Sequence, residues 1–216
     1  MFRFALVAAA LTLTGCVSVQ QMPMKASSAD VLKEKEIALS ERAKPDFAAT
    51  TPARGTFGMI GAAVMVSEGN KLIREHGIED PAHYIGKALV ADLQSRYNTR
   101  LSAKGVPTAG DELKDVLKNA NGADLVLDVR TINWSFSYFP TAWGKYRVMY
   151  SARLRLVDVK SGMLLAEGGC ARVPTQTDGA PSYGELMANA AARLKDELRI
   201  AAEHCITEFK SKTLAR

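Results

Sequence analysis

Two long runs of alternating apolar and polar residues in the second half of the chain predict a β-hairpin. Over residues 146–156 every second side chain is apolar, and the phase does not change. In the preceding run the apolar positions are odd-numbered over residues 125–129 and even-numbered over residues 132–138. Because side chains alternate with a period of two, such a change requires one extra residue in that strand. We therefore expect a β-bulge, in which Arg130 and Thr131 together oppose a single residue.

A third strand is predicted after the turn at Lys160-Ser161-Gly162, because glycine adopts the left-handed backbone conformation that a short hairpin turn needs. Its register places Cys170 on the apolar face of the sheet. On the other face the same register places Arg155 between Asp128 and Glu167. We expect this group of charges to be an exposed cross-strand ion-pair cluster.

Two shorter segments show the spacing of amphipathic helices. Asp80-Pro81 is a helix start, with an acidic N-cap and proline at the first helical position, and apolar residues follow on one face as far as Leu93. A second helix is expected over residues 112–120. A sheet with one apolar face is covered by helices on that face. The pattern predicts an α+β fold, with a mainly antiparallel sheet and helices packed on one face.

The N-terminus has a different pattern, a short basic start and then an uninterrupted apolar run from Phe4 to Leu11. A membrane-spanning helix needs about 20 apolar residues, so we interpret residues 1–15 as a signal peptide. Leu13-Thr14-Gly15-Cys16 resembles the lipobox of bacterial lipoproteins, which implies cleavage before Cys16 and attachment of diacylglycerol to it. A secretory signal that ends near a free cysteine is the alternative.

This resemblance implies a location. In Gram-negative lipoproteins an aspartate after the lipidated cysteine favours retention in the inner membrane, whereas this chain has Val17. The resemblance implies an outer-membrane protein that faces the periplasm and contacts the membrane through its lipid. Residues 16–35 are polar and are expected to form a tether to a single α+β domain over residues 36–216. Within that domain we expect a first strand over residues 36–40 and a loop over residues 44–54.

The longest helix is predicted near the C-terminus, and it places Cys205 where it can meet Cys170. Ser182-Tyr183-Gly184-Glu185 is a capping box that begins it. Its apolar face is formed by Leu186, Ala190, Leu194, Leu198, Ala201, Cys205 and Phe209. Because Cys170 also faces the core, and an exported protein favours disulfides, we expect Cys170 and Cys205 to be bonded. Two buried free thiols are the alternative.

The order of helix, strand and hairpin over residues 111–168 carries a further resemblance. The stretches GADLVLDV and LRLVDVKSGMLLAEG are similar to the periplasmic α+β domains of curli-secretion-type lipoproteins and of Tol-type translocation proteins. More broadly, the chain resembles uncharacterised envelope lipoproteins of Gram-negative bacteria. That resemblance implies a location and no activity.

The sequence contains few residues in the spacings that are typical of catalytic, metal or cofactor sites. His76, His83 and His204 lack metal-ligand spacing, and no nucleophile or cofactor motif is present. His204 adjoins Cys205 in the sequence, but neighbouring side chains on a helix point about 100° apart, so we do not expect the two to form a thiol–histidine pair. The net charge of +5 is dispersed among alternating acids and bases rather than gathered in a basic arm. We therefore expect no catalytic residue, no metal, no cofactor and no nucleic-acid partner.

Aromatic residues concentrate around the hairpin tip and form the candidate binding patch. Residues 134–150 hold seven of the fifteen aromatic residues, including both tryptophans. Phe139, Trp143 and Tyr146 lie at or beside the turn at residues 140–144, where a hairpin offers little to pack against. Exposed aromatic side chains there would mark a binding site, and cover for the core is the alternative.

These observations favour a non-catalytic binding or assembly module whose partner is an envelope protein, a lipid or a glycan. Glycines at three-residue spacing within residues 55–70 allow a second interpretation, a self-associating or membrane-perturbing component. A hydrolase whose polar residues converge in a cleft is a third. The sequence leaves the oligomeric state open.

Overall fold

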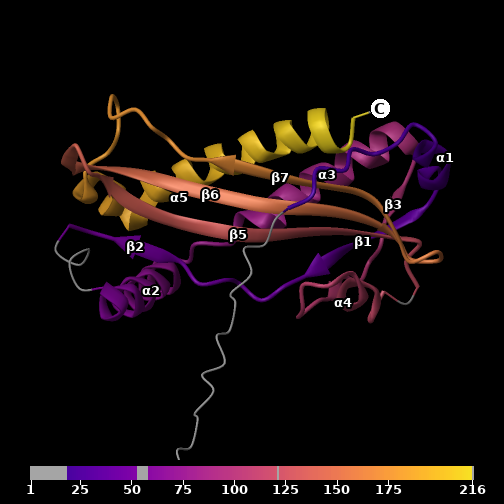
Figure 1. The fold of residues 1–216 in the computed structure, drawn as a ribbon, viewed down its shortest axis with the longest axis horizontal. Coiled ribbons are helices and arrows are strands. Elements are labelled where there is room, and N and C mark those ends of the chain that lie inside the picture. Colours follow the sequence, from indigo (N-terminus) through magenta and orange to yellow (C-terminus); the bar gives the residue numbers. More distant parts are fainter. Residues whose placement is uncertain (1–18, 53–57, 121, 216) are drawn as a thin grey trace, which may run out of the picture.

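The computed structural model describes residues 19–52, 58–120 and 122–215. In it, seven strands form one mixed sheet (Figure 1). The main path of the sheet is β3-β1-β5-β6-β7, with β4 beside β1 and β2 beside β5. The strands are β1 (Glu36–Glu41), β2 (Ala48–Thr50), β3 (Arg100–Leu101), β4 (Val106–Pro107), β5 (Leu125–Phe139), β6 (Ala142–Asp158) and β7 (Met163–Arg172). The long pairings β5–β6 and β6–β7 are antiparallel, so the expected α+β fold with a mainly antiparallel sheet is confirmed.

Two long helices cover the face of the sheet that the alternation predicted to be apolar. The helices are α1 (Ser28–Leu32), α2 (Gly58–Glu75), α3 (Pro81–Tyr97), α4 (Leu113–Leu117), α5 (Tyr183–Glu208) and the π-helical turn η1 (Phe209–Thr213). As expected, α3 begins after the N-cap Asp80, whose side chain accepts a hydrogen bond from the backbone N–H of Ala82. Buried residues of α3 and α5 share one core with Leu125, Leu127 and Leu154 of the sheet.

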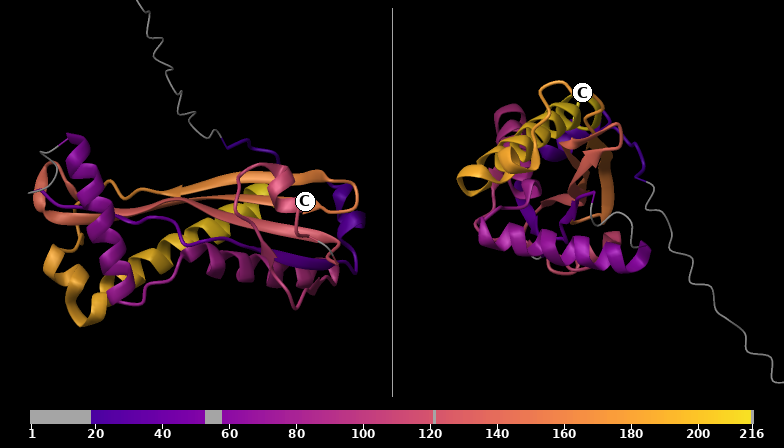
Figure 2. Two further views of the ribbon diagram at one scale, coloured as in Figure 1. Left: turned by 90° about the horizontal axis from the view of Figure 1, so that it is seen from below. Right: turned by 90° about the vertical axis from the view of Figure 1, so that its left-hand side faces the viewer.

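The opposite face of the sheet is also covered, so the expectation that the helices lie on one face only is wrong. Figure 2 (left) shows α3 and α5 on one side of the sheet and α4 on the other. The second core is small and consists of Ala38, Val106, Val116, Ala120, Val126 and Val157. Beside it, Arg155 lies between Asp128 and Glu167, as the register predicted. These two acids are not exposed, however. Arg42, which also binds Gly110 in the segment before α4, covers Asp128, and the N-terminal segment lies along β7 at Glu167.

The register of the β5–β6 hairpin agrees with the expectation on both sides of the bulge. The pairing shifts between Thr131 and Asn133, which leaves Ile132 as the extra residue. The bulge is confirmed, but it lies nearer the tip than expected, because Arg130 alone opposes Arg153. Ile132 is consequently turned outward and is 39% exposed.

The C-terminal helix α5 is broken near its start. Its capping box is present as expected, but Asn189, Ala190 and Ala191 have positive φ values of 52°, 55° and 58°. Residues with a Cβ rarely adopt this left-handed conformation, so the continuous helix expected from Ser182 onward is wrong here. The break changes the phase, and Ala191 rather than Ala190 is buried.

A disulfide joins the sheet to this helix. Cys170 of β7 and Cys205 of α5 are bonded, and their Cα atoms are 5.3 Å apart. Gly168, two residues earlier on β7, lies against Thr213, and a Cβ at this glycine would approach the threonine Oγ1 to 2.0 Å. The small residues of β7 therefore allow the close approach of strand and C-terminal helix on which the disulfide depends.

Part of the segment expected to be a tether packs against the domain instead. Met22 pairs with Glu167 at the outer edge of β7, through backbone hydrogen bonds of 2.7 and 2.9 Å. Met24 and Leu32 are buried in the main core, since burial removes these apolar side chains from water. The segment expected to be a loop, residues 44–54, contains the short strand β2.

Several expectations concern residues outside the part of the chain that the structure describes. These are the signal peptide of residues 1–15, the lipidated Cys16 and the first residues of the glycine-rich segment, residues 55–57. The rest of the glycine-rich segment forms the first part of α2. None of the helices in the described residues is long and apolar enough to cross a membrane.

Candidate functional site

The β5–β6 turn carries the most exposed large hydrophobic side chain of the described residues, Trp143, which is 67% exposed. Its indole N–H donates a hydrogen bond to the carbonyl oxygen of Pro140 at 2.8 Å. Its ring also packs against Tyr138 in an edge-to-face arrangement, with centroids 6.5 Å apart. The indole is thus exposed and yet held in one orientation, which lowers the entropy lost when a partner binds.

The other two residues of the predicted patch are not exposed. Phe139 is 4% exposed and lies under the guanidinium group of Arg147, 5.3 Å from the ring centroid. Tyr146 is 5% exposed, because the segment that leads into α5 covers it. Its backbone N–H donates to Pro181 at 2.8 Å, and its ring lies 5.8 Å from that of Tyr183.

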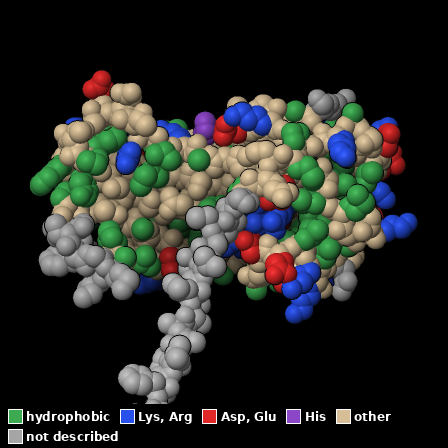
Figure 3. Space-filling view, viewed as in Figure 1, with side chains coloured by type: hydrophobic (Ala, Val, Ile, Leu, Met, Phe, Trp, Pro, Cys, Tyr) green, Lys and Arg blue, Asp and Glu red, His purple; other side chains and the backbone are tan. Residues whose placement is uncertain are grey.

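Tyr183 in turn extends the aromatic surface beyond the hairpin. It is 44% exposed and contacts Phe136 as well as Tyr146. We call the exposed or half-exposed residues Tyr138, Trp143 and Tyr183 the tip patch. In the view of Figure 3 hydrophobic side chains lie at this end with few charged ones, whereas over the half that holds α4 hydrophobic and charged side chains are mixed. Burial, together with the nearby Tyr183 and Tyr138, raises the pKa of Tyr146, so its hydroxyl is neutral at physiological pH.

A second candidate lies midway along β5, where the sheet has a gap. On the edge of β5 that faces away from β6, β1 pairs with residues 125–127 and β2 pairs with residues 135–137. Among the described residues, no strand pairs with residues 128–134 on that side. A cleft of about 670 Å³ occupies the gap, which we call the edge cleft. Its volume is within the range of small-molecule sites.

The polar groups of the edge cleft are arranged around Asp80. The Thr131 hydroxyl donates a hydrogen bond to the Asp80 carboxylate and lies 2.9 Å from the Tyr150 hydroxyl. Burial raises the pKa of Asp80, although the hydrogen bonds from Thr131 and Ala82 act in the opposite direction. Burial, with nearby Asp80, also raises the pKa of Tyr150. A neutral tyrosine and a buried carboxylate make this group a structural hydrogen-bond chain.

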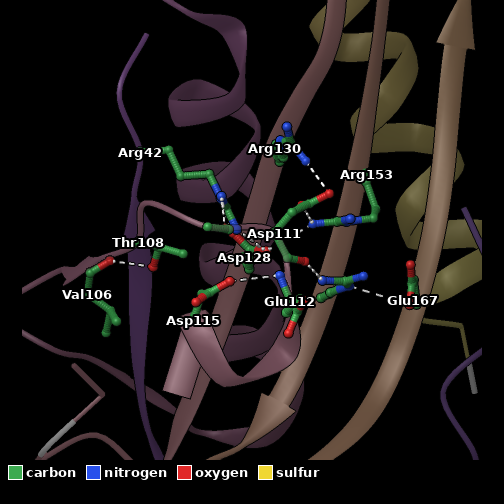
Figure 4. A network of polar contacts seen from close by, with 12 residues as sticks. Arg42, Val106, Thr108, Asp111, Glu112, Asp115, Asp128, Arg130, Arg153 and Glu167 are labelled. Atoms are coloured by element: carbon green, nitrogen blue, oxygen red, sulfur yellow. Dashed lines mark hydrogen bonds and ion pairs between the residues drawn. The ribbon is translucent and has the colours of Figure 1, made fainter. Parts of the chain in front are cut away.

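Next to the edge cleft lies a network of buried and half-buried ion pairs (Figure 4), formed by Arg42, Asp111, Asp128, Arg130, Arg153, Arg155 and Glu167. Arg42 donates two hydrogen bonds to the Asp128 carboxylate, at 2.7 and 2.9 Å, and a third to the carbonyl oxygen of Gly110. Asp111 pairs with both Arg130 and Arg153. This network fastens the segment before α4 to the sheet.

The network also sets the charge state of Asp111. Partial burial alone would raise the pKa of this carboxyl, but the hydrogen bonds and positive charges of Arg153 and Arg130 lower it below its ordinary value. Asp111 is therefore ionised at neutral pH and is committed to its two arginines. Such a charge-paired group is suited to holding a loop in place rather than to transferring protons.

The structure of the described residues places the three histidines of the sequence neither in a metal site nor beside a free thiol. No group of three or more histidine, cysteine and acidic side chains in the described ranges could hold a metal ion. His204 lies 3.6 Å from Glu208, and Cys205 is in the disulfide, so the two adjacent residues form no thiol–histidine pair. His83 lines the edge cleft without a hydrogen bond to a hydroxyl group.

No protein-family model and no curated protein matches the chain. Among solved structures, it is similar to the PelC dodecamer from Paraburkholderia phytofirmans, at 12% identity and a TM-score of 0.41, over 92% of this chain and 99% of that one. It is similar to the hypothetical protein CT253 from Chlamydia trachomatis, at 8% identity and a TM-score of 0.39, over 83% and 97% of the two chains. For lipoprotein GNA1162 from Neisseria meningitidis these values are 16%, 0.27, 75% and 96%.

Sequence reasoning identified Trp143 but missed Tyr183, the edge cleft and the burial of the ion-pair network. Tyr183 had a visible signal, because it is an aromatic residue in the first turn of a helix, where an aromatic side chain often packs on a neighbouring strand. The gap in the sheet had none, since it depends on where β1 leaves β5 and β2 joins it.

Proposed function

We propose that the protein is a non-catalytic binding module, attached to the outer membrane through Cys16, and that the tip patch is its contact surface. The exposure of the oriented Trp143 carries this proposal. Tryptophan and tyrosine are the residues most enriched at the energetic centres of interfaces. A contiguous exposed apolar patch is more typical of an interaction site than a single exposed residue, and the exposure of Tyr183 as well as Trp143 supports a partner that covers both.

The rest of the hairpin supports this surface. The pairing of β5 with β6 continues to the turn, and Tyr146 and Phe139 beneath the patch are buried. A rigid support of this kind keeps the exposed rings in place before a partner arrives, which favours binding. Lys145 is exposed beside Trp143 and provides a polar rim for an envelope protein or a glycan.

The edge cleft is less suited to a function of its own because its polar groups already serve the fold. Asp80 caps α3, and Lys44 donates to the carbonyl oxygen of Ile78 at 2.9 Å and pairs with Glu79. Arg42 is held by Asp128. An enzyme needs convergent groups that are free to meet a substrate, so we favour binding over hydrolysis.

The test is a comparison of two tryptophan variants. Trp143→Ala should leave the melting temperature nearly unchanged and abolish recovery of a partner from solubilised envelopes, because truncation of an interface anchor opens no core cavity. Trp134 is 1% exposed and packs against Phe47, so Trp134→Ala should lower the free energy of unfolding by about 3 to 5 kcal/mol.

The control for surface truncation is Met163→Ala, since Met163 is 62% exposed at the β6–β7 turn. This variant should keep both stability and partner recovery. Loss of stability in Trp143→Ala comparable to that in Trp134→Ala would show that the tip is structural and would refute the proposal.

A further inference from the structure

Part of the first half of α2 exposes small apolar side chains that pack against no other element of the described residues. Residues 58–67 contain no charged side chain. Ala62, Ala63 and Val64 are exposed, Val64 by 40%. The second half of the helix is fixed to the domain, since Leu72 and Ile73 are buried in the main core.

The packing of the second half of α2 on the domain sets the direction in which the first half of the helix projects. Gly69 packs so closely on β2 that a Cβ there would lie 2.0 Å from the carbonyl oxygen of Phe47. Both views of Figure 2 show that α2 crosses the end of the sheet and that its Gly58 end projects from the body. In both views this end lies on the side of the molecule from which the N-terminal segment, beginning at Val19, emerges.

The N-terminal segment allows little distance between the domain and an acylated Cys16. Met22 is fixed to β7 by two backbone hydrogen bonds with Glu167. Six residues of fully extended chain span at most about 20 to 22 Å, so an acyl group on Cys16 would hold this edge of the sheet close to the bilayer. The distance from Asp128, in register with Glu167 across β6, to Phe136 beside β2 is about 26 Å along β5.

We infer that the first half of α2 docks on the lipid bilayer as a second attachment point. This inference rests on the proposed acylation of Cys16. Two contacts on the same side, about 26 Å apart along the sheet, would lay the long axis of the domain along the membrane. Uncharged apolar residues on a projecting helix suit the boundary between headgroups and acyl chains, where the helix lies in the interface without spanning the bilayer.

A second copy of the chain is the competing occupant of this surface. A stable protein interface buries about 800 Å² on each partner. Ala62, Ala63 and Val64 are small side chains on about one turn of helix, and Glu68 is exposed directly beyond them. A bilayer needs no such area, because the acyl chain supplies the first attachment and holds the helix at the membrane.

The inference is tested on the acylated, disulfide-bonded protein in vesicles of phosphatidylethanolamine and phosphatidylglycerol. An environment-sensitive fluorophore is placed on Ala63→Cys, and a matched one on Asp196→Cys, an exposed position of α5. On reconstitution, emission from position 63 should shift to the blue and be quenched by nitroxide lipids, whereas emission from position 196 should not change. Equal, water-like emission from both positions would overturn the inference.

A second pair of variants separates this inference from the lipid anchor. In the acylated, vesicle-bound chain, Val64→Asp should lower the ratio of docked to undocked α2 about tenfold, equivalent to about 1.4 kcal/mol, as read from nitroxide quenching at position 63. Ile200→Asp, at a position of similar exposure on α5, should not lower it. If the acylated protein floats with the vesicles but position 63 stays exposed to water, the α2 contact is refuted and the lipid anchor on Cys16 is supported. If the protein does not float with the vesicles, the lipid anchor itself is refuted. A change at position 63 that follows protein concentration without vesicles would assign the surface to a second copy and overturn the inference.

Discussion

Replacement of Asp128 by asparagine tests the ion-pair network on the second face of the sheet. The Asp128 carboxylate is 0% exposed, accepts two hydrogen bonds from Arg42 and lies 3.7 Å from the Arg153 guanidinium. Asparagine keeps the volume but removes the charge, so two buried guanidinium groups lose a counter-ion. Removal of one partner from a buried pair costs about 3 to 5 kcal/mol. Because Arg153 keeps Asp111, we expect about 3 kcal/mol, a large part of the stability of a domain.

Urea unfolding with the disulfide intact measures this change as a difference in the free energy of unfolding at similar m values. The matched control is Asp30→Asn, which breaks the exposed pair with Lys33 and should have no measurable effect. In the Asp128→Asn background, Arg42→Met should recover part of the lost stability, because it removes an unpaired buried charge. If Asp128→Asn is as stable as the control, the reasoning about buried charge is wrong.

Three further predictions concern the disulfide, the cap of α3 and the lipid. Replacement of Cys170 and Cys205 by serine should lower the free energy of unfolding by about 3 to 4 kcal/mol in urea titrations, since the bond closes a loop between residues 35 apart; an unchanged midpoint would contradict this. Burial raises the pKa of Asp80 in the fold, so its contribution to stability is largest when protonated and is lost as pH rises through the folded pKa. In melts at neutral pH, Asp80→Asn should therefore be at least as stable as the wild type, and Asp80→Ala about 1 kcal/mol less stable; equal loss in both would argue against the buried charge. Labelled fatty acid should enter the wild type and not Cys16→Ala, and equal labelling would exclude the anchor.

The strand register was predictable because alternation constrains each pair of neighbouring strands directly. Cys170 opposite Ala152 and Arg155 opposite Asp128 both follow from matching apolar faces. The alternation does not determine the position of the bulge, because an extra residue at any site between the two phases brings the apolar faces of the two strands back into register. Ile132 was expected to face the core and is the residue that the bulge turns outward.

The parts that could not be predicted depend on contacts between segments far apart in the sequence. Asp128 and Glu167 have the composition of an exposed face, and contacts with segments far away in the sequence bury them. Arg42 and the segment before α4 cover Asp128, and the N-terminal segment at Met22 lies along β7 at Glu167. Tyr146 was expected to be exposed at the tip, and its cover comes from Pro181 and Tyr183. Trp143 has no such cover, and its exposure follows from a turn too short to bury its own side chains.

The central claim, that the tip patch contacts an envelope partner, is tested most directly by photo-crosslinking in living cells from position 143. A photoreactive residue at position 163, which is also exposed and lies at the opposite turn, is the control. We predict a discrete crosslinked product from position 143 and none from position 163, with the captured molecule identified by mass spectrometry. The absence of a product at position 143, or the same diffuse products from both positions, would contradict the claim.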